Sequence, residues 1–451
     1  MLGLDSQDLF IVQEYIKEFL ASKERKLMLD GQLYYENEPL GIEMPHAFMT
    51  NLVDEKVQYL LGKEPSITSS VDNSSYLDEV INVLSDNFLY DLQLLGTEIS
   101  NKGIAWEQLY FDEEGILKRM LIPSEQIKPV WVDNSHRELK WVIRIYDIEE
   151  YTNNKKETVT KVEVYDSDKS YYYILDNGTL KLDSEKCLQL NDNEEFGHFT
   201  IDGKQYSFGR VPFVFCKNNA CEMPDLKMVK ELIDAYCHNR ERLDKLLEDF
   251  KNFLVVIRNY AENPENAVSL DEMLEKRRIW VDTDGGVELV NPTIDTTANE
   301  SHDNTLKDDI ILFGRSVERN KMISGNTPSG VALKTLYSGL DLKCNKLEIE
   351  VKNYFNQLMW FIKSYLEVKG VSPQDKEKLS IILNRDITMN ESQVITDCKN
   401  SVGVISTKTI VANHPYVIDV DEELKQIEAE NAFNWQEYVK QLKDDNEEVE
   451  G

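Results

Sequence analysis

Residues Val331–Val368 constrain the fold more than any other stretch, and they read VALKTLYSGLDLKCNKLEIEVKNYFNQLMWFIKSYLEV. Their apolar side chains recur at steps of three or four residues, which places them on one face of a helix. This stripe consists of Leu340, Cys344, Leu347, Val351, Tyr354, Leu358, Ile362 and Tyr365. The pattern predicts one helix far longer than the roughly 8–20 residues usual in globular proteins.

A second long helix is predicted over Asp225–Tyr260, directly after Pro224. Its stripe comprises Val229, Ile233, Tyr236, Leu243, Leu247, Phe250, Leu254 and Ile257. A helix of about 36 residues would extend ~54 Å at a rise of 1.5 Å per residue. A globular monomer gains little from two such helices, so we expect them to bury their stripes against other subunits or to line an elongated stalk.

The segment between the two long helices is predicted to be a compact insert followed by a returning helix and a loop. In chain order it contains a short helix at Ser269–Lys276, a hairpin of Ile279–Val281 with Val287–Val290, a polar linker at Thr293–Asn304, a helix at Thr305–Ile323 and a loop at Ser324–Gly330. The hairpin turn is Asp282–Gly286, which contains the Asp-Gly pair typical of such turns. The loop is rich in turn-forming residues.

The first half of the chain predicts an α+β unit with an antiparallel sheet over Met1–Met223. Helical periodicity occurs at Asp5–Leu27, Pro45–Leu61 and Leu77–Glu98. β-rich runs follow at Ala105–Phe111, Ile116–Ile122, Trp141–Ile148, Val159–Tyr165 and Tyr171–Leu175. The C-terminal region adds a strand at Leu379–Leu383, helix starts at Asn390 and Ser406, and a charged helix at Val420–Leu442 before an acidic tail.

The charge of the chain limits how it can treat nucleic acid. Its 451 residues include 50 Lys and Arg against 82 Asp and Glu, which gives a net charge of −32. This balance argues against a protein that grips nucleic acid by neutralising phosphates. It does not exclude a protein that only lets nucleic acid pass.

The N-terminus and the cysteines indicate a reducing compartment. The first ten residues, MLGLDSQDLF, lack a basic segment, so we expect no signal peptide. No apolar run approaches the length of a membrane span. Six cysteines without a CxxC pair therefore predict reduced thiols.

Candidate chemical sites are few and weak. No GxxxxGK[ST] or GxGxxG motif is present, so we do not expect the chain to hydrolyse nucleotides. Cys216, Cys221, Cys237 and His238 could be read as zinc ligands, but buried free cysteines are the favoured interpretation. Acidic pairs are expected by chance in so acidic a chain; they include Glu194 with Glu195, Asp282 with Asp284, and Asp308 with Asp309. A metal-dependent hydrolase is thus an alternative without a distinctive motif.

Basic residues are grouped near the predicted hairpin and the predicted loop. The groups are Lys276–Arg278 beside the hairpin, Arg315, Arg319 and Lys321 before the loop, and Lys334 after it. Ordinary charged helix faces explain such groups most simply. The functional interpretation is partner docking for the first group and nucleic-acid contact for Lys334.

Six segments together resemble one known family, the portal (head–tail connector) proteins of tailed double-stranded-DNA bacteriophages, in the group common among phages of Gram-positive bacteria. They are NLVDEKVQYLLGKEP (51–65), GTEISNKGIAWEQLYFDEEG (96–115), GRVPFVFCKNN (209–219), LIDAYCHNRERLDKLLEDFKNFLVV (232–256), GNTPSGVALKTLYSGLDLKCNKLE (325–348) and GVISTKTIVANHPYVIDVDEELKQIEAE (403–430). They cover most of the chain in the order that the family has. Cys237 and His238 depart from the small polar residues common in the family's helix.

The resemblance implies a portal-like division of the chain. It assigns 1–224 to an α+β wing, 225–262 to a first stem helix, 263–304 to a clip, 305–323 to a second stem helix, 324–330 to a tunnel loop, 331–395 to a long wing helix and strand, and 396–451 to a crown and acidic tail. The chain is short for the family, which implies a reduced crown.

The resemblance also implies a function without catalysis. Family members form a ring, usually of twelve subunits, at one vertex of the virion capsid, and they conduct DNA during packaging and ejection. The implied partners are further copies of the chain, terminase, the major capsid and scaffolding proteins, a head–tail adaptor and double-stranded DNA of any sequence, with no membrane. No cofactor or metal is implied, the packaging ATPase is the separate terminase, and assembly is expected in the host bacterial cytoplasm.

Particular residues receive roles through the resemblance. Those implied to face DNA in the tunnel loop are Gly325, Asn326, Thr327, Pro328, Ser329, Gly330 and Lys334. Those implied to dock terminase or adaptor at the clip are Lys276, Arg277, Arg278, Trp280, Asp282 and Asp284. A protein-only connector or assembly scaffold, which never surrounds DNA, remains the main alternative.

Overall fold

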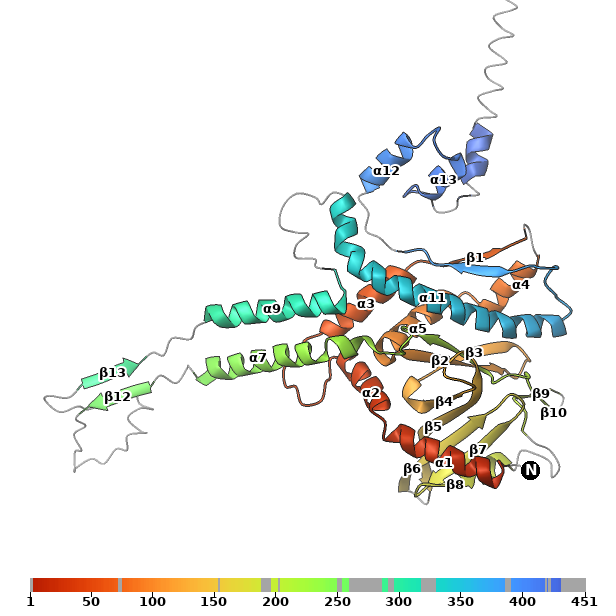
Figure 1. The fold of residues 1–451 in the computed structure, drawn as a ribbon, viewed down its shortest axis with the longest axis horizontal. Helices are drawn as coiled ribbons and strands as arrows, with labels where there is room; N and C mark the ends of the chain where they lie inside the picture. Colours follow the sequence, from red (N-terminus) through yellow and green to blue (C-terminus); the bar gives the residue numbers. More distant parts are fainter. Residues whose placement is uncertain are drawn as a thin grey trace, which may run out of the picture. The chain divides into compact units, whose positions relative to one another are not determined.

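The computed structural model describes most of the chain (Figure 1). The chain comprises two compact units. The described residues are 3–71, 75–152, 155–187, 196–201, 203–249, 254–258, 286–290, 296–317, 330–385, 391–417, 420 and 423–430. Unit 1 comprises Met1–Val317 and Gly339–Arg385, and unit 2 comprises Glu318–Ser338 and Asp386–Gly451. Each unit is described separately below.

The N-terminal half of unit 1 begins with helices that are shorter than the periodicity predicts. They are α1 (Ser6–Leu20), α2 (Lys23–Tyr35), α3 (Phe48–Leu61), α4 (Ser75–Leu84) and α5 (Phe88–Lys102). The prediction at Pro45–Leu61 is confirmed by α3. The single helices predicted at Asp5–Leu27 and Leu77–Glu98 are wrong, because each is interrupted by a local polar signal.

The two interruptions have identifiable causes. The hydroxyl of Ser22 accepts a hydrogen bond from the backbone N–H of Arg25, so Ser22 caps a new helix instead of continuing the first. Ser85 has a φ of +68°, a left-handed conformation that no continuous α-helix accommodates.

The sheets of unit 1 are antiparallel, as predicted. Five strands pair in the order β4-β5-β6-β7-β8 and three in the order β11-β2-β3. The strands of these sheets are β2 (Ile104–Phe111), β3 (Leu117–Ile122), β4 (Ile127–Trp131), β5 (Leu139–Thr152), β6 (Lys155–Tyr165), β7 (Ser170–Asp176), β8 (Thr179–Leu182) and β11 (Phe213–Lys217). Helix α1 covers the five-stranded sheet through Val12 and Ile16, which pack in one core with Val162 and Val164.

Smaller elements complete unit 1. They are β1 (Ser66–Ser69), which pairs with β14 (Leu379–Ile382), a β9 (Phe199–Ile201) and β10 (Lys204–Tyr206) pair, η1 (Ser124–Gln126) and α6 (Ser184–Cys187). The predicted strand at Leu379–Leu383 is confirmed by β14, whose partner lies more than 300 residues upstream in the chain.

Helix α11 (Gly330–Val368) confirms the longest predicted helix. Its stripe from Leu340 to Tyr365 is buried within its own chain, and Leu347, Val351 and Leu358 have no exposed surface. Gln357 fixes the helix to the three-stranded sheet by donating to the carbonyl oxygen of Phe215 over 3.1 Å. The expectation that this stripe would face other subunits is therefore wrong, because the apolar surface of the same subunit already covers it.

Helices α7 (Lys230–Asp249) and α9 (Thr296–Gly314) run side by side (Figure 1). They follow η2 (Asp225–Met228) and pack around one core with α3. Members of this core include Leu52, Val53, Val229, Ile233, Tyr236, Leu306 and Ile310.

The region beyond α7 corrects the extent of the first of the two long helices in chain order. The helix predicted at Asp225–Tyr260 ends at Asp249, and Leu254–Arg258 forms strand β12, because Val255, Val256 and Ile257 are β-branched residues that favour extended backbone. Among the described residues, β13 (Gly286–Val290) pairs with β12. Ile279–Val281, residues 282–285 of the predicted turn and the helix predicted at Ser269–Lys276 lie outside the described residues, so those predictions stay untested.

The returning helix begins earlier than predicted. Helix α9 starts at Thr296, within the segment predicted to be a polar linker. Asp303 explains the difference, because it is buried and accepts hydrogen bonds from the side chains of Asn239 and Arg240 on α7. A segment that reads as polar is thus held as a helix by contacts with a distant element.

Helix α9 ends at Gly314. The prediction that the helix at Thr305–Ile323 runs on without a break is therefore wrong, because Arg315 has a left-handed φ of +56°. Residues 318–323 lie outside the described residues.

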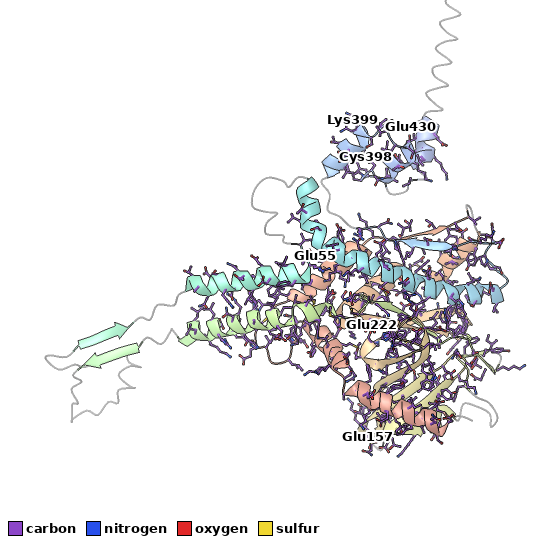
Figure 2. All side chains as sticks on the ribbon, viewed as in Figure 1. Glu55, Glu157, Glu222, Cys398, Lys399 and Glu430 are labelled. Carbon is purple, nitrogen blue, oxygen red and sulfur yellow. The ribbon has the colours of Figure 1, made fainter. Side chains whose placement is uncertain are left out.

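The described part of unit 2 beyond α11 is helical. It contains α12 (Glu391–Asn400), α13 (Thr407–Ala412) and a further helical segment at 423–430. The predicted helix start at Ser406 is confirmed, because its hydroxyl accepts from the backbone N–H of Thr409. The thiol of Cys398 lies 3.8 Å from the carbonyl oxygen of Ile410 and joins α12 to α13 (Figure 2).

Candidate functional site

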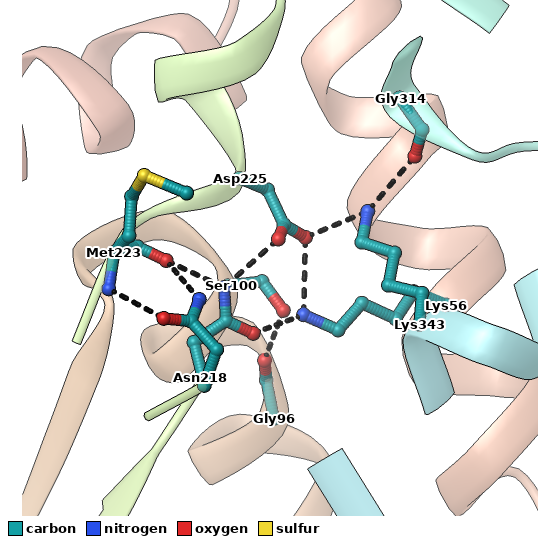
Figure 3. A network of polar contacts seen from close by, with 9 residues as sticks. Lys56, Gly96, Ser100, Asn218, Met223, Asp225, Gly314 and Lys343 are labelled. Carbon is teal, nitrogen blue, oxygen red and sulfur yellow. Dashed lines mark hydrogen bonds and ion pairs between the residues drawn. The ribbon is translucent and has the colours of Figure 1, made fainter. Parts of the chain in front are cut away.

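A buried charge cluster lies in unit 1 where η2, α3, α9 and α11 meet (Figure 3). Its centre is the carboxylate of Asp225, whose Oδ2 lies 3.0 Å from the Nζ of Lys56 and 2.9 Å from the Nζ of Lys343. Lys56 has no exposed surface. We call these three residues the junction cluster, because they tie the start of the α7/α9 pair to the long helix.

Amide and carbonyl groups complete the junction cluster. Asn218 donates from Nδ2 to Oδ1 of Asp225 over 2.9 Å, and its own Oδ1 accepts from Lys56. Lys343 donates to the carbonyl oxygen of Gly314 over 3.1 Å. Because Gly314 is the last residue of α9, the Lys343 cation also compensates the partial negative charge at that helix end.

The electrostatics of the junction cluster favour the ionised carboxylate. Burial alone would raise the pKa of Asp225, but the ammonium groups of Lys343 and Lys56 and the amide of Asn218 outweigh it and hold that pKa well below its usual range. Burial lowers the pKa of Lys56, and Asp225 offsets this only in part. The cluster therefore costs desolvation energy and depends on having every partner present.

The side chain of Glu55 holds the residues that directly follow α9. Glu55 on α3, labelled in Figure 2, accepts from the hydroxyl of Ser316 and, over 3.1 Å, from the backbone N–H of Val317. These bonds satisfy donors that follow the helix end. The α9 terminus is thus held by both α3 and α11.

Two further networks hold α11 in place. The hydroxyl of Tyr354 donates to the buried carboxylate of Glu107, and Arg119 joins that hydroxyl over 3.2 Å and Asp91 over 2.8 Å. Arg385 pairs with Asp341 over 2.6 Å and with Glu348 over 2.8 Å. All of these carboxylates are occupied by cations or hydroxyl donors, which is the arrangement of a rigid frame and not of a reactive group.

The sequence of the chain matches one family over most of its length. Residues 41–436 match the family described as "Phage portal protein, SPP1 Gp6-like". The chain belongs to this family. The resemblance predicted from the six segments is confirmed by this match.

Two relatives of this portal chain are named portal proteins. The chain is 30% identical over 426 residues to the portal protein of Bacillus phage SPP1, and the match covers 93% of this chain and 82% of the relative. It is 31% identical over 393 residues to the portal protein of Clostridium phage phiCD119, with coverages of 84% and 82%.

Chains from solved structures of gene transfer agent particles are also similar to the portal chain. One is a chain of "Virion of native gene transfer agent (GTA) particle", with a TM-score of 0.45, 9% identity and coverages of 86% and 92%. Another is a chain of "Neck of empty GTA particle computed with C6 symmetry", with a TM-score of 0.46 and the same identity and coverages.

The predicted contact residues of the portal chain lie almost entirely outside the described residues. Those outside are 276–278, 280, 282, 284 and 325–329. Gly330 is the first residue of α11 and Lys334 lies one turn later, and only their backbone is described. Their roles stay predictions.

The candidate zinc ligands lie in the described part of the portal chain, whereas Glu194, Glu195, Asp282 and Asp284 lie outside it. Among the described residues no group of three or more His, Cys, Asp and Glu side chains is placed to hold a metal ion. Cys216 and Cys237 are buried and Cys221 is exposed. Within the part of the chain that the structure describes, no helix is both long and apolar enough to cross a bilayer.

The junction cluster of the portal chain was not predicted from the sequence. A signal existed at Lys56, which shares the apolar face of α3 with Val53 and Leu60 and is as buried as they are. A lysine at such a position needs a buried anion. Its partner could not be named, because Asp225 lies 169 residues away in the chain.

Proposed function

We propose that this chain is the subunit of a portal ring of about twelve copies at one capsid vertex, through which double-stranded DNA enters during packaging and leaves during ejection. The observation that supports this proposal most strongly is the family match over residues 41–436. The relatives named as portal proteins support it over most of their own length.

In this proposal the described elements take portal roles. The α+β part of unit 1 is the wing, α7 and α9 are the stem, and α11 is the long wing helix. The stem ends at Asp249 instead of continuing to residue 262, and the clip includes β12 and β13. The segment 324–330 is the tunnel loop and unit 2 beyond residue 395 contributes the crown.

The charge of the chain supports a conduit. A ring of chains that each carry −32 repels phosphates and leaves their counterions in place, so DNA is not held by strong ion-pair contacts. A few amide and basic groups at Asn326 and Lys334 would then guide the duplex. Terminase and later the adaptor would dock at the clip through Lys276–Arg278, Trp280, Asp282 and Asp284, and the chain would need no cofactor or catalysis of its own.

Electron microscopy of the purified chain tests the ring directly. We expect end-on particles with a central hole under conditions that favour assembly, and a matching particle at the capsid vertex. A chain that stays monomeric by light scattering across concentrations and salts would contradict the proposal.

A packaging assay separates a conduit from a protein-only connector. We expect that replacing Asn326, Thr327 and Pro328 together lowers the amount of DNA packaged, whereas a matched replacement in an exposed turn, Glu113→Ala with Glu114→Ala, leaves it unchanged. Unchanged packaging by the loop variant would favour a connector that never surrounds DNA.

A further inference from the structure

A pocket of about 450 Å³ opens beside the junction cluster in unit 1. Its walls come from η2 and the loop before it, the end of α9, and one side of α11. Lys343 and Asp225 line it, so its inner wall is part of the junction cluster. The pocket is therefore a preformed feature with walls that are fixed before anything binds.

The rim of the pocket exposes large apolar side chains. Met228 is 57% exposed, Phe313 49% and Ile349 60%, and they come from three different elements. Leu312 and Leu342 extend the same exposed apolar character along α9 and α11. Apolar side chains gathered around a concave site are typical of a protein interface.

The charge at the pocket identifies its occupant. Arg315 and Lys346 line it and have no ion pair among the described residues, whereas Glu350 is the one lining carboxylate besides Asp225. A basic rim on a chain with 82 acidic residues is complementary to the rest of that chain's own surface. A second copy supplies both carboxylates and apolar groups.

We propose that this pocket receives a neighbouring copy of the same chain, with Met228, Phe313 and Ile349 as apolar anchors and Arg315 and Lys346 as partners of its carboxylates. The contact is heterologous, because a pocket on one copy must meet a different surface on the next, and such contacts form a ring when the rotation between copies closes. The inference rests on the proposed ring and adds the surface that joins its subunits.

The thiol of Cys221 allows the accessibility of the pocket to be measured. Its exposed thiol lines the pocket, whereas Cys216, Cys237, Cys344 and Cys398 are buried. In a full-length Cys187→Ser background, the rate of N-ethylmaleimide labelling at Cys221 is followed by mass spectrometry. We expect labelling at least about tenfold slower in the assembled species than in the monomer, because reactivity requires access to the thiol.

Substitution of a rim residue provides a second, independent test of the proposed contact. We expect Ile349→Asp to lower the assembled fraction at least about tenfold by mass photometry, since it places a carboxylate among desolvated apolar groups. Val132→Asp is the matched control, because Val132 is 56% exposed in the turn after β4 and is not among the residues that line the pocket. Circular dichroism establishes that both variants are folded.

The outcomes separate the inference from the ring itself. A ring in which Cys221 labels as fast as in the monomer, or an Ile349→Asp chain that assembles as Val132→Asp does, would overturn the inference and leave the portal function intact. Protection that appears only after another protein is added would also overturn it. A wild-type chain that never assembles would refute both.

Discussion

Replacing Asp225 by Asn removes the only carboxylate of the junction cluster while preserving its shape. Lys56 and Lys343, whose nitrogens lie 3.0 and 2.9 Å from that carboxylate, are then left with an amide oxygen. Removing one partner of a buried ion pair costs roughly 3–5 kcal/mol. We expect Asp225→Asn to lower the free energy of unfolding of unit 1 by about that amount at pH 7.

The pKa shifts of Asp225 and Lys56 predict how the free energy of unfolding changes with pH. The folded-state pKa of Asp225 is depressed, so its contribution is present above the ordinary value of 3.8 and is lost as the pH falls through the depressed one. Burial lowers the pKa of Lys56 below 10.5, so the unfolded state binds more protons and stability rises as the pH approaches that value. Asp225→Asn removes the loss of stability that protonation of Asp225 causes at low pH. It also makes stability rise more steeply with pH on the alkaline side, because Lys56 no longer has the carboxylate that raises its pKa.

Urea unfolding followed by tryptophan fluorescence between pH 3 and pH 10 is the assay. The matched control is Glu149→Gln, which makes the same carboxylate-to-amide change in an exposed pair with Lys156 and should leave stability unchanged within error. Adding Lys56→Met to Asp225→Asn should restore much of the loss, because it removes the unpaired buried ammonium. Equal effects of Asp225→Asn and Glu149→Gln, or no rescue, would refute this account of the cluster.

Three further predictions concern the frame around α11. Tyr354→Phe should cost about 1–3 kcal/mol in urea unfolding, because Glu107 loses a buried donor; Tyr110→Phe is the exposed control, and an equal effect of both would contradict the prediction. Gly103→Ala should destabilise strongly, since Gly103 has a φ of +86° and a Cβ would lie 2.2 Å from the carbonyl oxygen of Glu222. Gly115→Ala, with a φ of +73° in open space, should cost only about 1–2 kcal/mol, and a similar melting temperature for the two would count against the close approach. Burial raises the pKa of the Cys216 thiol well above its ordinary value, so Cys216 should stay unlabelled by maleimide at pH 8 until the chain is unfolded, and labelling in the native state would show that β11 opens.

Elements with strong local signals could be predicted from the sequence. The stripe of α11, the alternation in β2 and β5 and the cap at Ser406 each depend on residues a few positions apart, and all are confirmed. The family resemblance added the portal identity, because six ordered segments carry more information than any one pattern. Periodicity was misleading where a local polar residue interrupts a helix, as Ser22 does.

Contacts between distant residues lay beyond such patterns. Leu254–Arg258 continues the apolar stripe of α7, yet it becomes a strand by pairing with Gly286–Val290 about thirty residues later. The stripe of α11 is compatible with either an interface or a core, and the apolar surface of the same subunit makes it a core.

The amino-acid order is enough to establish which segments are helical or extended, the acidic charge and the portal family, because these depend on neighbours in the chain or on overall composition. The junction cluster and the pocket beside it depend on folding, since Lys56, Asp225 and Lys343 are separated by more than a hundred residues at each step. A buried ion pair is stable only where the whole fold excludes water and supplies every partner, and no local pattern records that condition.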